Sequence, residues 1–153
     1  MERDKQLYYK DGYKYLVTRP YSIKLDIIPF KVICLSFKTC DISGNCVEAS
    51  LVTMTIDGKT TVFPGYAWDG ASGPTIDTLS SMIASLIHDV IYQFIRLGLI
   101  DEKYKEYADQ CLHDLCTEDG MMELRADIWK FAVDCFGKGS ILPSAEHSEL
   151  VAP

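Results

Sequence analysis

The feature that most constrains the fold is a change of hydrophobic pattern near Pro64. Before it, residues 7–63 form short runs rich in Val, Ile, Tyr, Phe and Thr, separated by turn residues such as Asp57-Gly58. β-Branched and aromatic side chains favour a half-buried pleated surface, and the breakers supply turns. This half therefore predicts strands within about 7–63 that form an antiparallel sheet. Its clearest element is a hairpin made of residues 47–56 and 60–63.

After Pro64 the sequence predicts a loop over 64–76 and then helices. Apolar residues recur at three- and four-residue steps between 79 and 94, which indicates a helix with one buried stripe. Asp77 or Thr78 can cap its start, and Gly98 can end it. A second helix is expected over about 101–117 and a third over about 120–136, closed by Gly137.

The order of strands followed by helices predicts the α+β class, with an N-terminal antiparallel sheet followed by three helices. A chain of 153 residues lies within the usual size of one domain, so we expect a single domain over 1–139. Residues 140–153 have no periodicity and contain two prolines, which favours a flexible C-terminal tail.

Charge and hydropathy exclude some partners. The net charge of −7 repels phosphate backbones, so no nucleic-acid partner is expected. No apolar run approaches the ~20 residues of a membrane-spanning helix, and the first residues lack the apolar core of a signal peptide. We therefore expect no transmembrane segment and a cytoplasmic location.

The six cysteines contain no CxxC pair, so zinc-ribbon and thioredoxin-like functions have no support. Cys40 and Cys46 flank a predicted hairpin tip and could face each other across two strands. In a reducing cytoplasm they would more often remain buried thiols, and a disulfide is the alternative.

The helix expected over residues 77–98 carries the residues most suited to chemistry. Opposite its apolar stripe lie Ser85, His88 and Tyr92 on a largely polar face, where small residues leave room beside the imidazole. If the next helix packs antiparallel, Asp109 can reach His88. An imidazole oriented by a carboxylate is the minimum apparatus of a general base.

A glycine-rich loop, Trp68-Asp69-Gly70-Ala71-Ser72-Gly73, precedes this helix. Asp89 projects about 100° round the helix from His88 and could bind a divalent cation together with Asp69 and loop carbonyls. Calcium prefers such oxygen ligands, and zinc or manganese are alternatives. Trp68, Gly70, Ser72 and Ser85 are the candidate substrate-side residues.

Plainer interpretations exist for each feature. A His-Asp pair on an amphipathic helix is usually a solvated edge, and Asp69-Gly70 is most often a simple turn. His113, four residues after Asp109, fits a surface or helix-packing role better than a ligand role. Tyr92 could bury its ring and leave its hydroxyl in water.

Three segments resemble an uncharacterised domain family found mainly in tailed phages and prophages. They are residues 63–72 (Phe-Pro-Gly-Tyr-Ala-Trp-Asp-Gly-Ala-Ser), 84–92 (Ala-Ser-Leu-Ile-His-Asp-Val-Ile-Tyr) and Ala108-Asp109, followed by a helix ending at Phe136-Gly137. This resemblance covers about half of the chain and implies a phage-encoded protein, made in the host cytoplasm, that acts there or is incorporated in the virion.

The same segments are similar, more distantly, to secreted phospholipases A2. That resemblance implies His88 as the base, Asp109 as the carboxylate that orients it, Tyr92 as a supporting tyrosine, and Asp89 with the 66–73 loop as a calcium site. The chain departs from that family by having no cysteines around His88 and a different glycine pattern in the loop.

Three functions follow as hypotheses. The first is a metal-assisted hydrolase acting on an ester or amide. The second is a structural or assembly protein of the phage virion or tail, in which the same residues form a structural polar network. The third, suggested only by size and charge, is a small acidic inhibitor of a host defence protein.

Overall fold

The computed structural model describes residues 2, 9–10, 15–70 and 78–142. The chain forms two compact units, residues 1–70 and residues 71–153, called here the N-terminal and C-terminal units. The single domain expected over residues 1–139 stays a prediction. Within the described part, none of the helices combines the length and apolar character that crossing a membrane requires.

The described part of the N-terminal unit consists of antiparallel strands, as predicted, but these form two sheets rather than one. A three-stranded sheet has the order β1-β2-β7, and a four-stranded sheet has the order β3-β6-β5-β4. The strands are β1 (Tyr9–Lys10), β2 (Tyr15–Val17), β3 (Tyr21–Lys24), β4 (Ile33–Cys40), β5 (Cys46–Met54), β6 (Lys59–Val62) and β7 (Ala67–Trp68). β7 lies inside the predicted 64–76 loop, because two residues are too short to show an alternating pattern.

The hairpin predicted over residues 47–63 is confirmed as the antiparallel pair β5–β6. Its turn requires Gly58, which has φ +84° and lies so close to the carbonyl groups of Leu25 and Ile27 that a Cβ would overlap them. Alternate residues of the paired strands are buried, among them Val52, Met54 and Val62. The period-two alternation therefore marks a real inward face.

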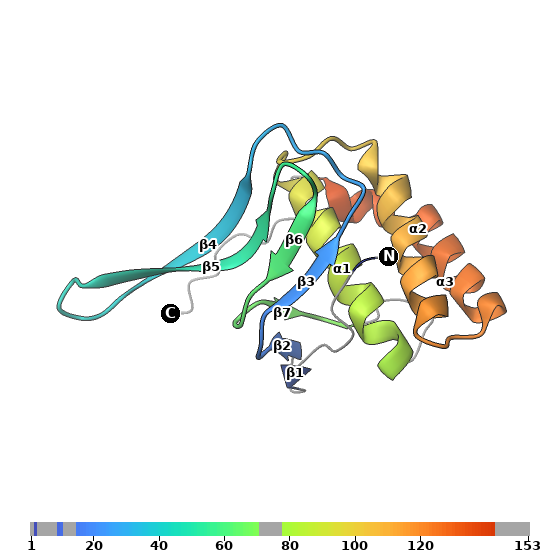
Figure 1. Ribbon diagram of the computed structural model, residues 1–153, viewed down its shortest axis with the longest axis horizontal. Coiled ribbons are helices and arrows are strands. Elements are labelled where there is room, and N and C mark those ends of the chain that lie inside the picture. Colours follow the sequence, from blue (N-terminus) through green and yellow to red (C-terminus); the bar gives the residue numbers. More distant parts are fainter. Residues whose placement is uncertain (1, 3–8, 11–14, 71–77, 143–153) are drawn as a thin grey trace. The chain divides into compact units, whose positions relative to one another are not determined.

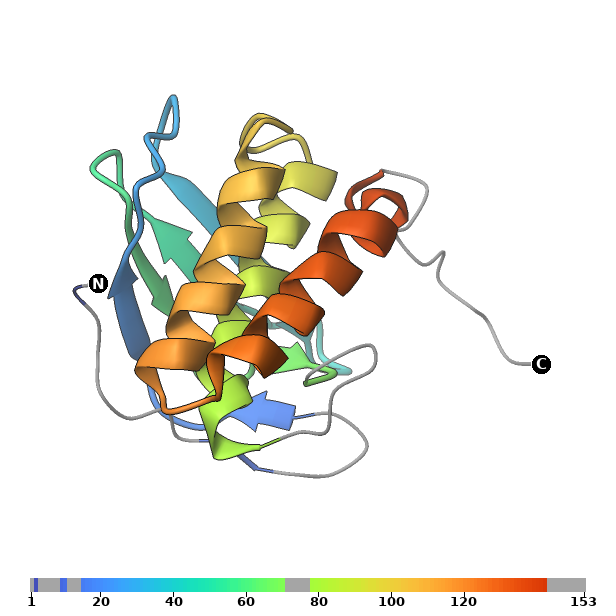
Figure 2. The same ribbon diagram turned by 90° about the vertical axis from the view of Figure 1, so that its right-hand side faces the viewer.

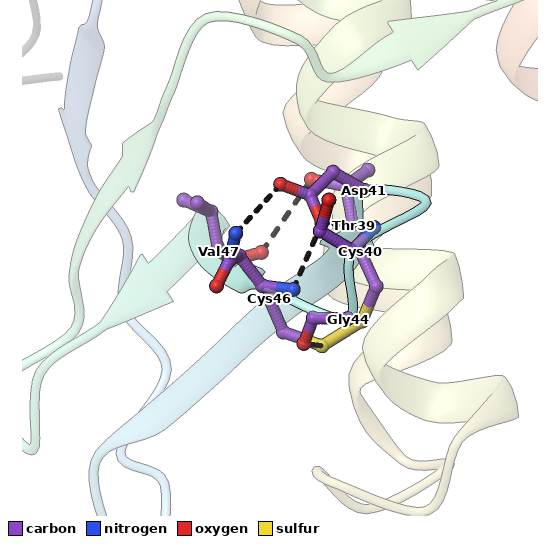
Figure 3. The surroundings of a disulfide bond; sticks show 8 residues. Thr39, Cys40, Asp41, Gly44, Cys46 and Val47 are labelled. Atoms are coloured by element: carbon purple, nitrogen blue, oxygen red, sulfur yellow. Dashed lines mark hydrogen bonds between the residues drawn. A yellow bond between two sulfur atoms is a disulfide. The ribbon is translucent and has the colours of Figure 1, made fainter.

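β4 and β5 extend well past the other strands as a two-stranded arm (Figure 1). A register shift between Leu35 and Ser36 separates the inner part of the arm from the outer part, in which nearly every residue is exposed. At its tip Cys40 and Cys46 form a disulfide (Figure 3). Asp41 accepts backbone hydrogen bonds across the turn. The two cysteines are thus bonded and exposed, which corrects the expectation of buried thiols.

The C-terminal unit contains the three predicted helices, α1 (Leu79–Arg96), α2 (Tyr104–Glu118) and α3 (Glu123–Phe136), followed by the 3₁₀ helix η1 (Gly137–Ile141). Consecutive helices run in opposite directions and lie side by side (Figure 2). Residues 140–141 of the predicted tail are therefore part of η1, and residues 143–153 lie outside the described residues. Thr78 is the N-cap of α1, and its backbone N–H donates to Ser81 Oγ at 2.9 Å. Gly98, at φ +66°, follows the end of the helix as predicted.

The surroundings of α1 differ from the prediction of a polar, accessible face. Thirteen of its 18 residues are buried, including Ser81, Ala84, Ser85, His88 and Tyr92 on the side expected to face a cleft. A helix that is covered on nearly all sides places its polar side chains in a medium of low polarity. Each of those groups must then find a partner inside the protein.

Candidate functional site

The expected contact between the first two helices is present. His88, in the middle of α1, and Asp109, in the first half of α2, are joined by a 2.9 Å hydrogen bond between imidazole Nε2 and carboxylate Oδ1. α1 and α2 pack antiparallel (Figure 2), and both side chains are buried. Two segments 21 residues apart in sequence therefore form one polar cluster.

Asp109 is the centre of this cluster and is completely buried. Its Oδ1 accepts hydrogen bonds from His88 and from the hydroxyl of Tyr92, the latter at 2.7 Å. Its Oδ2 accepts a hydrogen bond from Nζ of Lys105 at 2.6 Å. A carboxylate taken out of water is stable only when it is paired and hydrogen-bonded, and Asp109 is both.

The hydrogen bond to Asp109 determines which atom of His88 can react. In neutral imidazole one nitrogen carries the proton and the other carries a lone pair. Nε2 donates to Asp109, so the lone pair of the neutral ring is on Nδ1, which lies 3.9 Å from Oδ1 of Asp89. That separation is too long for a hydrogen bond. Nδ1 is therefore the basic atom of the site.

Burial alone would lower the pKa of His88, but the carboxylates of Asp109 and Asp89 outweigh it and raise the pKa above its usual value. For Asp109, burial opposes ionisation, yet hydrogen bonds from His88, Lys105 and Tyr92 bring its pKa down to about 2. Burial and the neighbouring Asp109 raise the pKa of the Tyr92 hydroxyl, which stays protonated and acts as a donor. The cluster therefore holds an anionic carboxylate among three donors.

Tyr92 plays a part in the cluster that differs from the prediction of a wet hydroxyl. Its ring lies 4.0 Å from the imidazole of His88, measured between ring centres, and its hydroxyl is bonded to Asp109. The backbone at Gly137 closes over that hydroxyl so tightly that a Cβ there would overlap it. The glycine predicted only as a helix stop thus also makes room for Tyr92.

Lys105 was not predicted as a site residue, although a signal existed in its spacing. Lys105 and Asp109 are four residues apart on one helix, the spacing at which oppositely charged side chains meet. His113, four residues on the other side of Asp109, lies outside the cluster. Its two ring nitrogens lie 3.1 Å from Asp114 and from Asp127, so it links α2 to α3, consistent with the helix-packing interpretation.

The proposed cation ligands are only partly placed. Asp89 is about one-third exposed beside Nδ1 of His88. In the part of the chain that the structure describes, no group of three His, Cys, Asp or Glu side chains has the arrangement of a metal site. Asp69 belongs to the other compact unit, where it is exposed. A cation held by Asp89 and Asp69 therefore stays a prediction.

The predicted substrate-side residues take varied positions. Trp68 is buried in β7 with its ring 5.4 Å from that of Tyr15, and Gly70 follows with φ +79°, the positive value typical of glycine in a turn. Ser85 is buried in α1 and donates to the carbonyl of Met82 at 3.1 Å, so it is not an open contact surface. Ser72 lies outside the described residues.

Comparison of the chain with protein-family models, with curated proteins and with solved structures found no match. The function is therefore inferred from the chemistry of the His88 cluster itself.

Proposed function

We propose that the protein is a hydrolase in which His88 activates a water molecule for attack on an ester or amide carbonyl. The observation that carries this proposal is the 2.9 Å bond from His88 Nε2 to a fully buried carboxylate. That bond fixes the tautomer and leaves the lone pair on Nδ1, the arrangement needed in a general base.

Nδ1 of His88 accepts one proton from water while the water oxygen forms a bond to the carbonyl carbon. The imidazolium so formed is stabilised by the negative charge of Asp109, and it then returns the proton to the departing alcohol or amine as the bond to that group breaks. Tyr92 and Asp109 keep the ring in place and do not themselves exchange protons.

A divalent cation bound by Asp89 and Asp69 would polarise the carbonyl oxygen, and calcium is the first choice because its ligands are oxygens. Titration calorimetry with calcium, zinc and manganese on wild type and Asp89→Ala tests this part alone. Binding by wild type that is lost in the variant is expected. Absence of binding by wild type would remove the cation from the proposal.

The catalytic proposal is tested with a panel of chromogenic esters and amides, using wild type, His88→Gln and His113→Gln. We expect His88→Gln to lose at least about 100-fold in kcat/KM, the usual contribution of a general base, with an unchanged circular dichroism spectrum. His113→Gln is the matched control, because this histidine also lies between carboxylates but outside the cluster. Equal activity of wild type and His88→Gln would contradict the proposal.

A second candidate function is structural, and a specific observation favours it. Both oxygens of Asp109 are occupied by partners within the protein, and only 9% of the His88 side chain is exposed. Buried polar networks that are fully bonded specify one packing arrangement. With the resemblance to phage domains, this favours a virion or tail component. Mass spectrometry of purified particles would then find the protein in fixed stoichiometry.

A further inference from the structure

α3 has two apolar faces, and only one of them is covered. On the covered face Ala126 and Trp129 are buried, and α3 lies alongside α2 (Figure 2). On the other face four large apolar side chains are exposed: Leu124 by 67%, Ile128 by 53%, Phe131 by 69% and Phe136 by 81%. A surface helix normally has one apolar stripe with polar residues opposite it. The second apolar face therefore indicates a contact surface.

The exposed side chains have the spacing of a helix-packing surface. Four of them form one ridge at four-residue steps, and two more lie beside it at a three-residue step. We call these six residues the outer stripe of α3: Leu124, Ile128, Ala132 and Phe136 in the ridge, with Phe131 and Cys135 beside it. Ridges of this kind fit between the same ridges of a second helix, which is the commonest packing of helices in globular proteins. The small side chain of Ala132 allows two such ridges to approach closely.

The outer stripe is large for a surface that stays in water. Its four exposed large side chains present roughly 500 Å² of apolar surface, if each has ~150–250 Å² in total. Monomeric proteins rarely expose a contiguous apolar patch of more than a few hundred Å². Together with a polar rim, this area approaches the ~800 Å² that each partner contributes to a stable interface. The stripe therefore has the size of one half of a dimer interface.

The charges beside the outer stripe favour a second copy of this chain over a strongly charged partner. Asp127 and Asp134 flank the stripe, and each already has a partner within the chain. Asp127 lies 3.1 Å from His113, and Asp134 lies 3.0 Å from Lys130. Such a rim offers little to an oppositely charged protein, and it can meet its own copy without burying an unpaired charge. Homodimer interfaces have the same character, with an apolar centre and few charges.

We propose that the outer stripe is a dimer interface, in which α3 of one chain packs against α3 of a second copy about a two-fold axis. In a two-fold interface the same patch is used by both chains, so each residue of the stripe becomes buried twice. The net charge of −7 opposes association, so added salt should strengthen the dimer by screening this repulsion. The interface does not include the His88 cluster and is independent of the function proposed for it.

Sedimentation equilibrium of the full chain tests the interface with wild type, Phe131→Glu and Phe30→Glu. We expect wild type to dimerise at micromolar concentrations. Phe131→Glu should raise the Kd by about 100-fold or more, because it places a carboxylate in the apolar centre of the interface. Phe30→Glu is the matched control, since Phe30 is also exposed but lies outside α3. It makes the same chemical change and should leave the Kd unaltered. Circular dichroism checks that both variants are folded.

Two native cysteines locate the interface without a substitution. Cys135 belongs to the outer stripe, Cys34 lies in β4, and both are exposed. The rate of their alkylation by iodoacetamide is measured by peptide mass spectrometry at protein concentrations below and above the Kd. Alkylation of Cys135 should become slower as the dimer forms, whereas alkylation of Cys34 should keep the same rate.

Several results would overturn the proposal. One is a wild type that stays monomeric at all concentrations, and another is a dimer that Phe131→Glu and Phe30→Glu weaken equally. Alkylation of Cys135 that is slow at every concentration would mean that another part of this chain covers the stripe. Alkylation that is fast at every concentration would place the dimer contact elsewhere. A dimer that weakens as salt is added would have a charged interface instead. If Phe131→Glu does not fold, the alkylation rates of wild type decide.

Discussion

Two lysine–aspartate pairs, one in each compact unit, have the same separation and very different surroundings. Lys24 and Asp57 lie 2.6 Å apart with 36% and 65% of their side chains exposed. Lys105 and Asp109 also lie 2.6 Å apart, but 13% and none of their side chains are exposed. In both pairs a hydroxyl group also donates to the aspartate, from Thr55 in the first and Tyr92 in the second.

The comparison shows that distance alone does not reveal what a charged pair does. Water competes for both members of the exposed pair and salt screens them, so such a pair contributes little to stability. The buried pair cannot be separated without leaving a charge in a poorly solvated place. In this protein the buried pair is also the one attached to an imidazole, and so its electrostatics can influence chemistry.

The largest expected effect on stability comes from removing Asp109, and removal of Asp57 is the comparison. Asp109→Ala leaves Lys105 and His88 without their common partner, and the free energy of unfolding should fall by about 3–5 kcal/mol, the usual cost of breaking a buried pair. Asp57→Ala should change it far less, because both partners are solvated. Urea denaturation followed by circular dichroism measures both. Similar losses of unfolding free energy in the two variants would contradict the distinction between the buried and the exposed pair.

The buried pair should also depend on close packing around its hydroxyl donor. In Gly137→Ala the new Cβ overlaps the Tyr92 hydroxyl, so overpacking should cost about 1–3 kcal/mol and displace that donor from Asp109. Gly139→Ala is the control, because a Cβ there meets nothing within 4 Å. Thermal unfolding compares them, and equal melting temperatures for the two variants would show that Tyr92 is not confined by η1.

At high salt, the buried and the exposed pair should contribute differently to the loss of stability at acid pH. Because the pKa of Asp109 is lowered to about 2 from a usual value of 3.8, its contribution of about 2 kcal/mol is complete above pH 4 and is lost as the pH falls toward 2. Asp109→Asn should reduce this loss of stability between pH 4 and pH 2. The reduction should persist in 1 M salt, which screens exposed charges. The pKa of Asp57 is also lowered to about 2, mainly by Lys24. Because salt screens this exposed pair, Asp57→Asn should change the stability at acid pH only at low salt.

Titration of His88 changes the stability in the opposite sense, so that stability falls as the pH rises. Its raised pKa means that its stabilising contribution is present below about pH 6.5 and is lost as the pH rises through the folded-state value. The midpoint of urea unfolding of wild type should therefore decline above neutrality. His88→Gln should remove this decline, and a decline that persists in His88→Gln would assign it to another group.

The smallest effect is expected for the hydroxyl donors. Tyr92→Phe removes one of three hydrogen bonds to a buried carboxylate and should cost about 1 kcal/mol. Thr55→Val removes the matching donor from the exposed Asp57, where water replaces it, so a smaller loss is expected. A larger loss of stability in Thr55→Val than in Tyr92→Phe would show that exposure does not decide how much these hydrogen bonds contribute to stability.

The sequence predicted the fold class and the contact between His88 and Asp109 because both follow from periodicity. The 3.6-residue pattern placed the two side chains on their helices, and a short connection made those helices antiparallel neighbours. The pattern could not show that the supposedly polar face of α1 is buried. Small and polar residues such as Ala84 and Ser85 are compatible with either surroundings.

The rest of the cluster depends on tertiary packing that no local pattern encodes. Asp109 has an i,i+4 neighbour on each side, Lys105 and His113, and both could have been its partner. The structure selects Lys105, which also reaches the carbonyl of Val133, while His113 contacts Asp127. The fit of Tyr92 beneath Gly137 likewise depends on where η1 follows α3.

The most direct test of the account is the tautomer of His88 in the folded protein, measured by nitrogen-15 NMR of the imidazole above its pKa. The hydrogen bond to Asp109 predicts a neutral ring protonated on Nε2, with the lone pair on Nδ1. A neutral ring protonated on Nδ1 would leave no basic atom beside Asp89 and would contradict the proposed role of His88.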